Sequence, residues 1–365
     1  MADKLSVCRE GLPIYDIVLE NSFAGLEKEV DKLSLKDRKI CIVTDSNVAG
    51  LYLEEVKERL ESCCRQISVF VFPAGEENKN LDTVRRLYEH LILEQFDRKD
   101  MLAALGGGVV GDLCGFGAAT YLRGIDFFQI PTTLLAQVDS SIGGKTGVDF
   151  DAYKNMVGAF HMPKLVYTNL ETLKTLTEEQ FSSGMGEVIK HGLIKNKAYY
   201  QWLKDNRKGI LNRNLDLCRK MVYESNLIKK QVVEKDPTEQ GERALLNFGH
   251  TLGHAVEKSM DFSMLHGHCV GLGAIAAAYI SKIRGMLSQK EWDDIRDTFK
   301  SFNLPVHVDG LAWEEIFQAA KRDKKMDAGI VKFILLESTG NAYVDKTVKE
   351  EEMQAGFACI GGSKE

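Results

Sequence analysis

The first half of the chain alternates short apolar runs with longer stretches in which apolar residues recur every three or four positions. The runs at residues 39–45 (KICIVTD), 67–72 (ISVFVF) and 101–105 (MLAAL) predict strands. The stretches at residues 49–63 and 80–94 predict amphipathic helices. Strands separated by helices of this length are typical of a doubly wound, mainly parallel sheet.

The second half has a different pattern. The helical period dominates residues 178–235, 244–260 and 268–284, and strand signals are few. The sequence therefore predicts two domains, with a boundary between Leu170 and Thr177. Residues 1–174 should form an α/β domain with a Rossmann-like sheet, and residues 175–365 a mostly α-helical domain.

Composition and charge exclude some classes of protein. With 44% apolar and 27% charged residues, the chain has ample material for a core. A net charge of −6 argues against a general nucleic-acid-binding protein, which needs a basic surface. The eight cysteines are scattered and form no CxxC motif, so we expect free thiols.

No segment indicates export or membrane insertion. The first residues, MADKLSVCREGLPI, lack the apolar core of a signal peptide. The longest apolar run, residues 269–280, is too short to cross a bilayer. We therefore expect a cytoplasmic protein without a membrane partner.

A glycine-rich loop, LGGGVVGD at residues 105–112, follows a strand and opens a helix. Its glycines allow a ligand to approach the backbone, and a helix N-terminus favours an anion. Gly106, Gly108 and Gly111 satisfy GxGxxG, although on about the fourth strand rather than the first, so this is not the standard dinucleotide fingerprint. The alternative is a tightly packed turn without a ligand.

Polar residues at the ends of other strands favour a nucleotide. Asp45 ends one strand, where a carboxylate can bind ribose hydroxyls, and Glu76 and Lys79 follow another. Because ligands of open α/β sheets bind at the carboxyl ends of the strands, these loops should converge on one cleft. NAD or a similar nucleotide is the expected ligand.

The stretch DSSIGGKTGVD at residues 139–149 resembles a P-loop only superficially. A P-loop needs a glycine five residues before Gly144, and that position is Asp139. The mismatch removes the best support for an ATPase. Lys145 is better interpreted as a point charge beside a phosphate or carboxylate.

Four of the eight histidines lie between residues 250 and 268. His250 and His254 share a helical face, and His266 and His268 follow after a turn. A catalytic zinc takes three protein ligands and leaves one position open. Glu187 is a candidate for the carboxylate ligand and His191 a weaker rival, but spacing does not decide which histidines bind. A polar helix face without a metal is the alternative.

Two basic segments suit a polyanionic substrate. The segment KKQVVEKDPTEQGER spans residues 229–243, and RDKK spans residues 322–325. In isolation, either segment is also compatible with an ordinary solvated surface.

Seven motifs in this order resemble the 3-dehydroquinate synthase family, within the sugar phosphate cyclases. They are GGGVVGD, YLRG, IPTTLLAQVDSSIGGKTGVD, KNMVGAFHMP, GMGEVIKHG, LNFGHTLGHAVE and LHGHCVGLG. Together they cover nearly the whole chain and are far more specific than any single glycine loop.

The resemblance implies a dinucleotide domain of the glycerol-dehydrogenase type, followed by a helical metal domain, usually in a homodimer. It implies that zinc, or alternatively cobalt, is held by Glu187, His250 and His266. His254 would transfer a proton, and His268 would have no role in the site. The implied NAD contacts are Asp45, Asn47, Glu76, Lys79, Gly107, Gly108, Val109, Asp112, Thr132, Thr133, Asp139, Ser140, Lys145, Lys154, Thr172 and Thr175.

The implied substrate is 3-deoxy-D-arabino-heptulosonate 7-phosphate, and the products are 3-dehydroquinate and phosphate. The implied steps are transient oxidation at C5 by NAD, elimination of phosphate, re-reduction, ring opening and intramolecular aldol closure. The enzyme would thus be a carbon–oxygen lyase of aromatic amino acid biosynthesis. The implied substrate-binding and catalytic residues are Arg123, Lys145, Asn155, Lys190, Lys229, Glu239, Arg243, Asn247, His254 and, within RDKK, Lys324.

Three other functions remain open on the sequence. A polyol dehydrogenase of the same fold would accumulate NADH, but a simple polyol does not need the cluster of basic residues. A related sugar phosphate cyclase would share the zinc and NAD motifs but differ at the carboxylate-binding and proton-relay positions. A catalytically silent sugar-phosphate sensor would not need His254.

Overall fold

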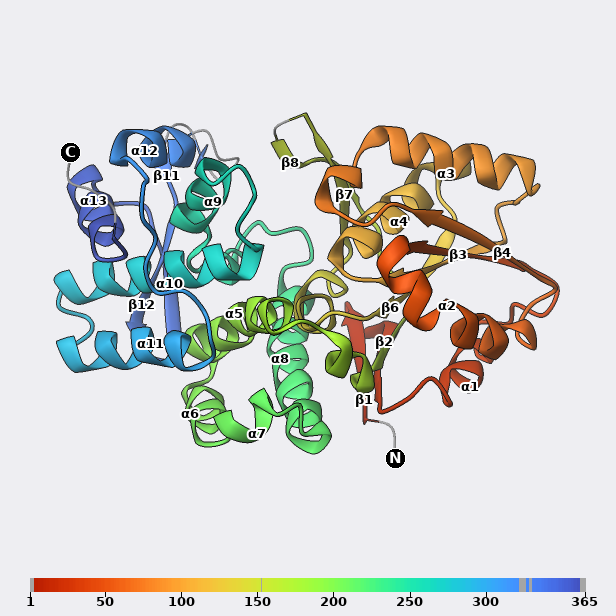
Figure 1. Cartoon of the computed structure of the whole chain (residues 1–365), viewed down its shortest axis with the longest axis horizontal. Helices are drawn as coiled ribbons and strands as arrows, with labels where there is room; N and C mark the ends of the chain where they lie inside the picture. Colours follow the sequence, from red (N-terminus) through yellow and green to blue (C-terminus); the bar gives the residue numbers. More distant parts are fainter. Residues whose placement is uncertain (1–2, 152, 322–325, 328–329, 362–365) are drawn as a thin grey trace. The chain divides into compact units, whose positions relative to one another are not determined.

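The computed structural model describes residues 3–151, 153–321, 326–327 and 330–361. Lys324, one of the expected substrate-binding residues, lies outside the described residues. The chain divides into two compact units, Met1–Thr175 and Leu176–Glu365 (Figure 1).

The first unit is built on a seven-stranded sheet with the order β1-β2-β9-β6-β5-β3-β4. All neighbouring strands run parallel except the antiparallel pair β1 and β2. The predicted strands are present, and with them the predicted fold class is confirmed. The strands are β1 Asp3–Arg9, β2 Leu12–Glu20, β3 Lys39–Asp45, β4 Gln66–Phe72, β5 Met101–Gly106, β6 Asp126–Pro131 and β9 Leu165–Asn169.

Helices cover both faces of this sheet (Figure 1). Successive residues of a strand point to opposite faces, so Ile40 and Ile42 pack with α1 Leu26–Asp31 and α2 Ser46–Glu61. Cys41 and Val43 pack on the other face. The helices there are α3 Leu81–Leu93 and α4 Gly108–Thr120.

Helix α2 begins three residues earlier than the periodicity predicted. Asp45 is its N-cap, and the carboxylate oxygen Oδ1 accepts the backbone N–H groups of Asn47 at 2.8 Å and Val48 at 2.9 Å. A capped N-terminus satisfies donors that would otherwise be unpaired, so the helix extends to the end of β3.

The strand order creates a switch point between β3 and β5. From β3 the chain moves to β4 on one side, and it then returns to β5 on the other side and continues outward to β6. The loops after β3 and β5 therefore lead to opposite sides at the carboxyl ends of the strands, and such a switch point is the usual ligand site of these sheets. Asp45 ends β3 and Gly107 directly follows β5, so both lie at the switch point.

Short elements complete the first unit. An antiparallel hairpin of β7 and β8 carries the predicted residues Lys145, Lys154 and Asn155. These elements are η1 Glu76–Asn78, η2 Tyr121–Arg123, η3 Ala136–Ser140, β7 Lys145–Phe150, β8 Tyr153–Phe160 and η4 Leu170–Thr175.

The second unit is mainly helical, as expected, but it also contains two short antiparallel pairs, β10–β11 and β12–β13. The apolar run of β12 packs against α10, and it is too short to stand out in the sequence. The elements are α5 Glu178–Lys195, α6 Lys197–Asp205, α7 Arg207–Leu211, α8 Leu215–Lys235, η5 Glu242–Asn247, α9 His250–Ser259, α10 His266–Ile283, α11 Gln289–Ser301, α12 Trp313–Lys321, β10 Met326–Asp327, β11 Ile330–Val331, β12 Phe333–Ser338, β13 Asn341–Asp345 and α13 Glu350–Ala358.

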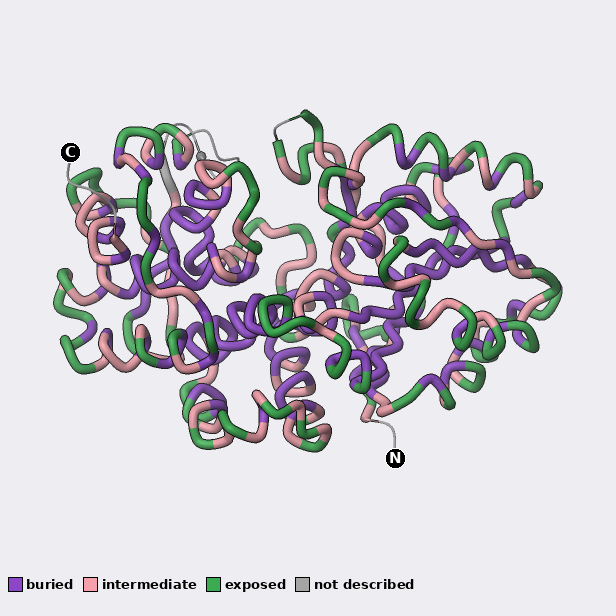
Figure 2. The backbone as a smooth tube through the Cα atoms, viewed as in Figure 1, coloured by how far each residue is buried: buried purple, intermediate pink, exposed green. Residues whose placement is uncertain are grey.

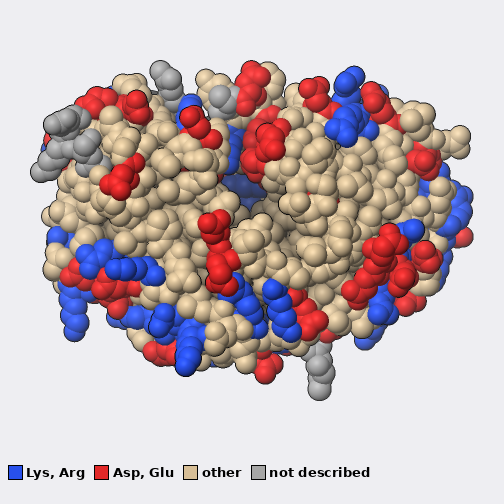
Figure 3. Space-filling view, viewed as in Figure 1, with Lys and Arg blue, Asp and Glu red and all other residues tan. Residues whose placement is uncertain are grey.

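Helices α5 and α10 form the centre of the second unit and are buried along most of their length (Figure 2). Within the residues that the structure describes, no helix has the length and apolar character needed to span a membrane. All eight cysteines are free, as expected. On the face shown in Figure 3, acidic and basic side chains are interspersed.

Glycines allow α5, α9 and α10 to approach one another backbone to backbone. A Cβ atom on Gly186 would lie 2.4 Å from the carbonyl oxygen of Gly267, and one on Gly267 would lie 1.8 Å from that of Ser183. A Cβ on Gly253 would lie 2.8 Å from the carbonyl oxygen of Cys269. No side chain fits at these contacts, so the three helices cross at a separation that only glycine permits.

We expect Gly267→Ala to lower the free energy of unfolding by about 3 kcal/mol or more, because the new methyl group meets backbone and forces α10 away from α5. Chemical denaturation measures the change. The control is Gly50→Ala on α2, where a Cβ meets no atom within 4 Å. That variant should gain about 0.5–1 kcal/mol from helix propensity. Equal stability of the two variants would contradict the close crossing.

Candidate functional site

Three of the four clustered histidines face one another in the second unit. The ring centroid of His250 lies 5.1 Å from that of His254 and 5.5 Å from that of His266, and the last two rings are 5.7 Å apart. A nitrogen atom from each ring lies within 4.8 Å of the others, so the three could hold a metal ion. Helix α9 supplies His250 and His254, and the first residue of α10 is His266.

The predicted carboxylate ligand, Glu187 on α5, reaches the same place. Its Oε1 lies 3.7 Å from His250 Nε2 and 3.6 Å from His266 Nε2. Its Oε2 pairs with the Nζ of Lys190, one turn later on the helix. The side chain of Glu187 is fully buried, so its carboxylate is held within the unit. The structure therefore brings together Glu187, His250, His254 and His266.

The far nitrogen of each predicted histidine ligand also has a partner. Nδ1 of His250 lies 3.2 Å from the carbonyl oxygen of Phe248, and Nδ1 of His266 lies 3.4 Å from Glu257 Oε2. Burial opposes a charge on His266, but hydrogen bonds to Glu187 and Glu257 raise its pKa to about 9. Both rings thus point Nε2 toward Glu187.

Glu257 was not among the site residues expected from the sequence. A signal was present, because Glu257 lies seven residues after His250 and three after His254, on the same face of α9. A carboxylate three or seven residues from a histidine lies on the same side of the helix and can contact the histidine cluster.

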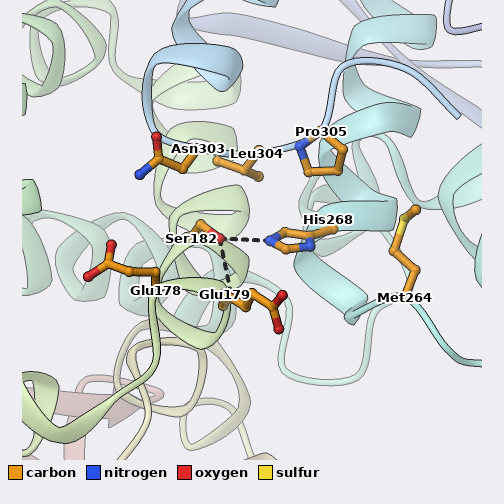
Figure 4. A pocket seen from close by; sticks show the side chains of 8 residues that line it. All are labelled: Glu178, Glu179, Ser182, Met264, His268, Asn303, Leu304 and Pro305. Atoms are coloured by element: carbon orange, nitrogen blue, oxygen red, sulfur yellow. Dashed lines mark hydrogen bonds between the residues drawn. The ribbon is translucent and has the colours of Figure 1, made fainter.

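His268 is separated from the other three histidines. Its Nε2 is hydrogen-bonded to Ser182 Oγ at 2.7 Å, and it lines a pocket of about 600 Å³ (Figure 4). This pocket contains none of the predicted site residues. The other lining residues are Glu178, Glu179, Met264, Asn303, Leu304 and Pro305.

Buried cations lie deeper in the second unit. Lys190 on α5, Lys229 on α8 and Arg243 on η5 are 1%, 5% and 2% exposed, and the three elements pack against one another. The alternative interpretation, in which Lys229 and Arg243 belong to a solvated surface, is therefore wrong. Arg243 donates to the carbonyl oxygen of Pro237 at 2.6 Å.

Two further predicted substrate residues contact each other. Asn247 donates from Nδ2 to Glu239 Oε1 at 2.6 Å. Asn247 ends η5, the element that also carries Arg243.

In the first unit, Lys79 is surrounded by carboxylates. Its Nζ lies 2.7 Å from Glu76, 3.6 Å from Asp112 and 3.8 Å from Asp149. Burial alone would lower the pKa of Lys79, but these carboxylates raise it. Lys154 Nζ lies 3.7 Å from Glu76 Oε1. Four predicted NAD contacts, Glu76, Lys79, Asp112 and Lys154, therefore form one cluster.

The charged groups of this cluster affect the pKa of the Asp112 carboxyl. Burial raises the pKa of Asp112 to about 7; the charge of Lys79 acts against this shift, and the charges of Glu76 and Asp149 add to it. Asp149, which the sequence analysis did not single out, accepts the N–H of Asn155 at 2.7 Å. It thereby joins the hairpin to the cluster.

The glycine-rich loop makes close contacts with the loop after β6. A Cβ on Gly107 would lie 3.0 Å from Thr133 Cγ2, and one on Gly108 would lie 3.2 Å from Ser140 Oγ. The loop opens a helix, as predicted: Gly107 is the N-cap of α4, and Val109 is partly exposed in its first turn. Thr132 follows β6 directly and donates its N–H to the carbonyl oxygen of Gly106 at 3.0 Å.

The remaining predicted residues of the first unit differ in exposure. Arg123, Lys145 and Asn155 are exposed, and Arg123 and Asn155 have left-handed φ values of 71° and 52°. Thr172 is buried and accepts Gln137 Nε2 at 3.0 Å, while Thr175 is hydrogen-bonded to Tyr52. Asp139 is partly exposed at the end of η3.

Comparison with known proteins adds independent information. The family model described as 3-dehydroquinate synthase N-terminal matches residues 69–183, and the one described as 3-dehydroquinate synthase C-terminal matches residues 184–326. A 3-dehydroquinate synthase of Acetivibrio thermocellus is 41% identical over 339 residues, covering 93% of this chain and 94% of the relative. One of Symbiobacterium thermophilum is 42% identical and covers 96% of this chain and 98% of the relative.

Solved structures show the same fold. A 2-epi-5-epi-valiolone synthase of Streptomyces hygroscopicus subsp. jinggangensis, solved with NAD⁺ and Zn²⁺, has a TM-score of 0.88 and 24% identity over 95% of this chain and 96% of that chain. A 2-deoxy-scyllo-inosose synthase, solved with carbaglucose-6-phosphate, NAD⁺ and Co²⁺, has a TM-score of 0.87 and 22% identity over the whole of both chains.

We expect Asp112→Asn to stabilise the protein more at about pH 8 than at about pH 4. A carboxyl whose folded-state pKa is raised to about 7 contributes stability at low pH that is lost as the pH rises through about 7. The asparagine does not titrate, so the difference in unfolding free energy between variant and wild type should grow by on the order of 2 kcal/mol. Urea denaturation at both pH values measures it, and a constant difference would contradict the assignment.

Proposed function

The chain belongs to the 3-dehydroquinate synthase family, and we propose that it converts 3-deoxy-D-arabino-heptulosonate 7-phosphate into 3-dehydroquinate and phosphate. The observation that carries this proposal is identity above 40% over more than nine-tenths of the chain to proteins of that name. The site supports it with a carboxylate–histidine cluster and three buried cations.

The residues of the second unit fit a metal ion. We assign Glu187, His250 and His266 as its ligands, because one carboxylate and two imidazoles are a common donor set for catalytic zinc. Cobalt(II) accepts the same donors. Once bound, the metal would supply Lewis-acid polarisation of a substrate oxygen. The proximity of Glu187 Oε1 to the Nε2 atoms of both His250 and His266 supports this assignment.

The loops at the switch point of the first unit fit NAD. The N-terminus of α4, with its close-packed Gly107 and Gly108, suits a pyrophosphate, and the cluster around Lys79 suits ribose and nicotinamide hydrogen bonds. When bound, NAD would accept a hydride temporarily and give it back, so that no net oxidation results. Asp45 and Asn47 lie at the start of α2, at the same switch point.

Each group of charged side chains has a distinct task in the proposed reaction. Lys190, Lys229 and Arg243 are suited to bind the substrate carboxylate, because buried cations interact strongly with an anion that replaces water. Arg123, Lys145 and Asn155 are suited to bind the phosphate. Asn247 and Glu239, already hydrogen-bonded, would orient substrate hydroxyls.

His254 lies next to both histidine ligands and is suited to move a proton. Its ring lies 5.1 Å from that of His250 and 5.7 Å from that of His266, measured between ring centroids. We assign it the transfer of the proton from the substrate hydroxyl that is oxidised. The phosphate group can itself accept the proton removed next to the resulting ketone, so no further carboxylate base is needed.

The remaining parts of the proposal follow from the family resemblance. We propose that the enzyme is a carbon–oxygen lyase, that it acts as a homodimer and that it works in the cytoplasm. A basic anion site, rather than a basic surface, then accounts for the local clusters of lysine and arginine in a chain of net charge −6.

The direct assay follows phosphate release from the heptulosonate phosphate with catalytic NAD while the NADH absorbance is recorded. We expect stoichiometric phosphate release without NADH accumulation, and loss of the activity after chelation. Restoration by zinc or cobalt is the control for damage by the chelator. NADH that rises in step with substrate loss would instead identify a dehydrogenase.

Substitutions can distinguish a metal ligand from a proton-transfer residue. We expect His250→Ala to bind zinc at least about 100-fold more weakly, because it removes a ligand. His254→Gln should retain zinc and lower kcat by about 100-fold or more. Measuring zinc content and steady-state kinetics for both variants checks the assignment. If His254→Gln lost its zinc, the site would be a three-histidine site, and the proposed role of His254 would be wrong.

A further inference from the structure

We propose that Glu257 is a positioning residue for the metal ligand His266. Its carboxylate accepts the Nδ1 proton of that imidazole and holds Nε2 toward the metal. The inference rests on the proposed function, because it assumes that His266 binds a metal.

The imidazole of His266 lies between two buried carboxylates. Glu187 is 3.6 Å from Nε2, and Glu257 is 3.4 Å from Nδ1. The side chain of Glu187 is fully buried and that of Glu257 is only 3% exposed. Only one of these carboxylates can share a metal with His266, because a ring nitrogen must face the metal and the other nitrogen must carry the proton.

The position of the other proposed ligands shows that Glu187, and not Glu257, shares the metal with His266. Glu187 Oε1 also lies 3.7 Å from His250 Nε2, so the side on which two histidines and one carboxylate converge is the Nε2 side. Glu257 lies on the opposite side of the ring, behind the ligand. A metal-bound histidine usually donates its second N–H to a carboxylate or carbonyl oxygen, which fixes the tautomer and makes the ligand more basic.

The two histidine ligands are held in different ways. His250 has a backbone carbonyl, that of Phe248, behind its Nδ1, whereas His266 has a charged carboxylate. A charge-assisted hydrogen bond is stronger than a neutral one. His266 should therefore bind the metal more strongly than His250 does. Of the two groups behind the imidazoles, a backbone carbonyl and the Glu257 side chain, only the side chain can be removed by substitution.

The fold keeps Glu257 in place. Helix α9 presents His250, His254 and Glu257 at spacings of four and three residues, on one face toward α10. The close approach of Gly253 to Cys269 holds α9 against α10, whose first residue is His266. The three side chains of α9 therefore all approach His266 from one helix.

The test measures zinc affinity of the full-length protein by competition with a chromophoric chelator. Glu257→Gln keeps the size and an acceptor oxygen but removes the charge, and we expect about 10-fold weaker binding; Glu257→Ala should approach 100-fold. Glu257→Asp keeps the charge one methylene further away and should fall between wild type and Glu257→Ala. The matched control is Asp261→Asn, which removes a charge from an exposed residue just after α9 and should bind zinc as wild type does.

Two further readouts separate this role from a purely structural one. The absorption spectrum of the cobalt form should shift in Glu257→Gln, because the donor strength of His266 changes. The increase in Tm on adding zinc should shrink, while the Tm of the metal-free protein changes little. Wild-type zinc affinity and an unchanged cobalt spectrum in Glu257→Gln would overturn the proposal. If the wild type itself bound neither zinc nor cobalt, the metal assignment of the proposed function would fail as well.

Discussion

The candidate metal site depends on how closely three helices approach one another. A carboxylate on α5 meets histidines from α9 and α10 because α10 packs closely against both of the other helices. Gly186, Gly253 and Gly267 permit this contact. The residues next to them in sequence are the ones that converge: Glu187 follows Gly186, His254 follows Gly253, and His266 precedes Gly267.

In the first unit, strand direction rather than helix packing brings the candidate binding residues together. Parallel strands place their carboxyl ends at one edge, and the change of direction between β3 and β5 sends the loops that follow them to opposite sides. The cost is a concentration of buried charge around a single lysine: burial, to which the charges of Glu76 and Asp149 add, raises the pKa of Asp112 to about 7. Groups with displaced pKa values tend to gather at functional sites, because a site selected for binding is not optimised for stability.

Much of this organisation is readable in the sequence. Alternating apolar runs predicted β3, β4 and β5 to within a residue, and glycines after a strand predicted the start of α4. Local patterns could not predict which charged residues are buried, so for Lys229 and Arg243 a substrate site and a solvated surface both stayed open until packing placed them inside. They also could not separate His268 from the other histidines, since the direction of a side chain at the start of a helix depends on its neighbour, here Ser182.

A redox-neutral cyclisation makes one demand that no dehydrogenase meets: the hydrogen that leaves C5 of the substrate must return to the same molecule. Turnover of substrate deuterated at C5, with the product examined by mass spectrometry and NMR, tests this directly. The account predicts that the deuterium is retained at the corresponding carbon of 3-dehydroquinate, with none in solvent or in free NADH. Loss of the label from the product would contradict it.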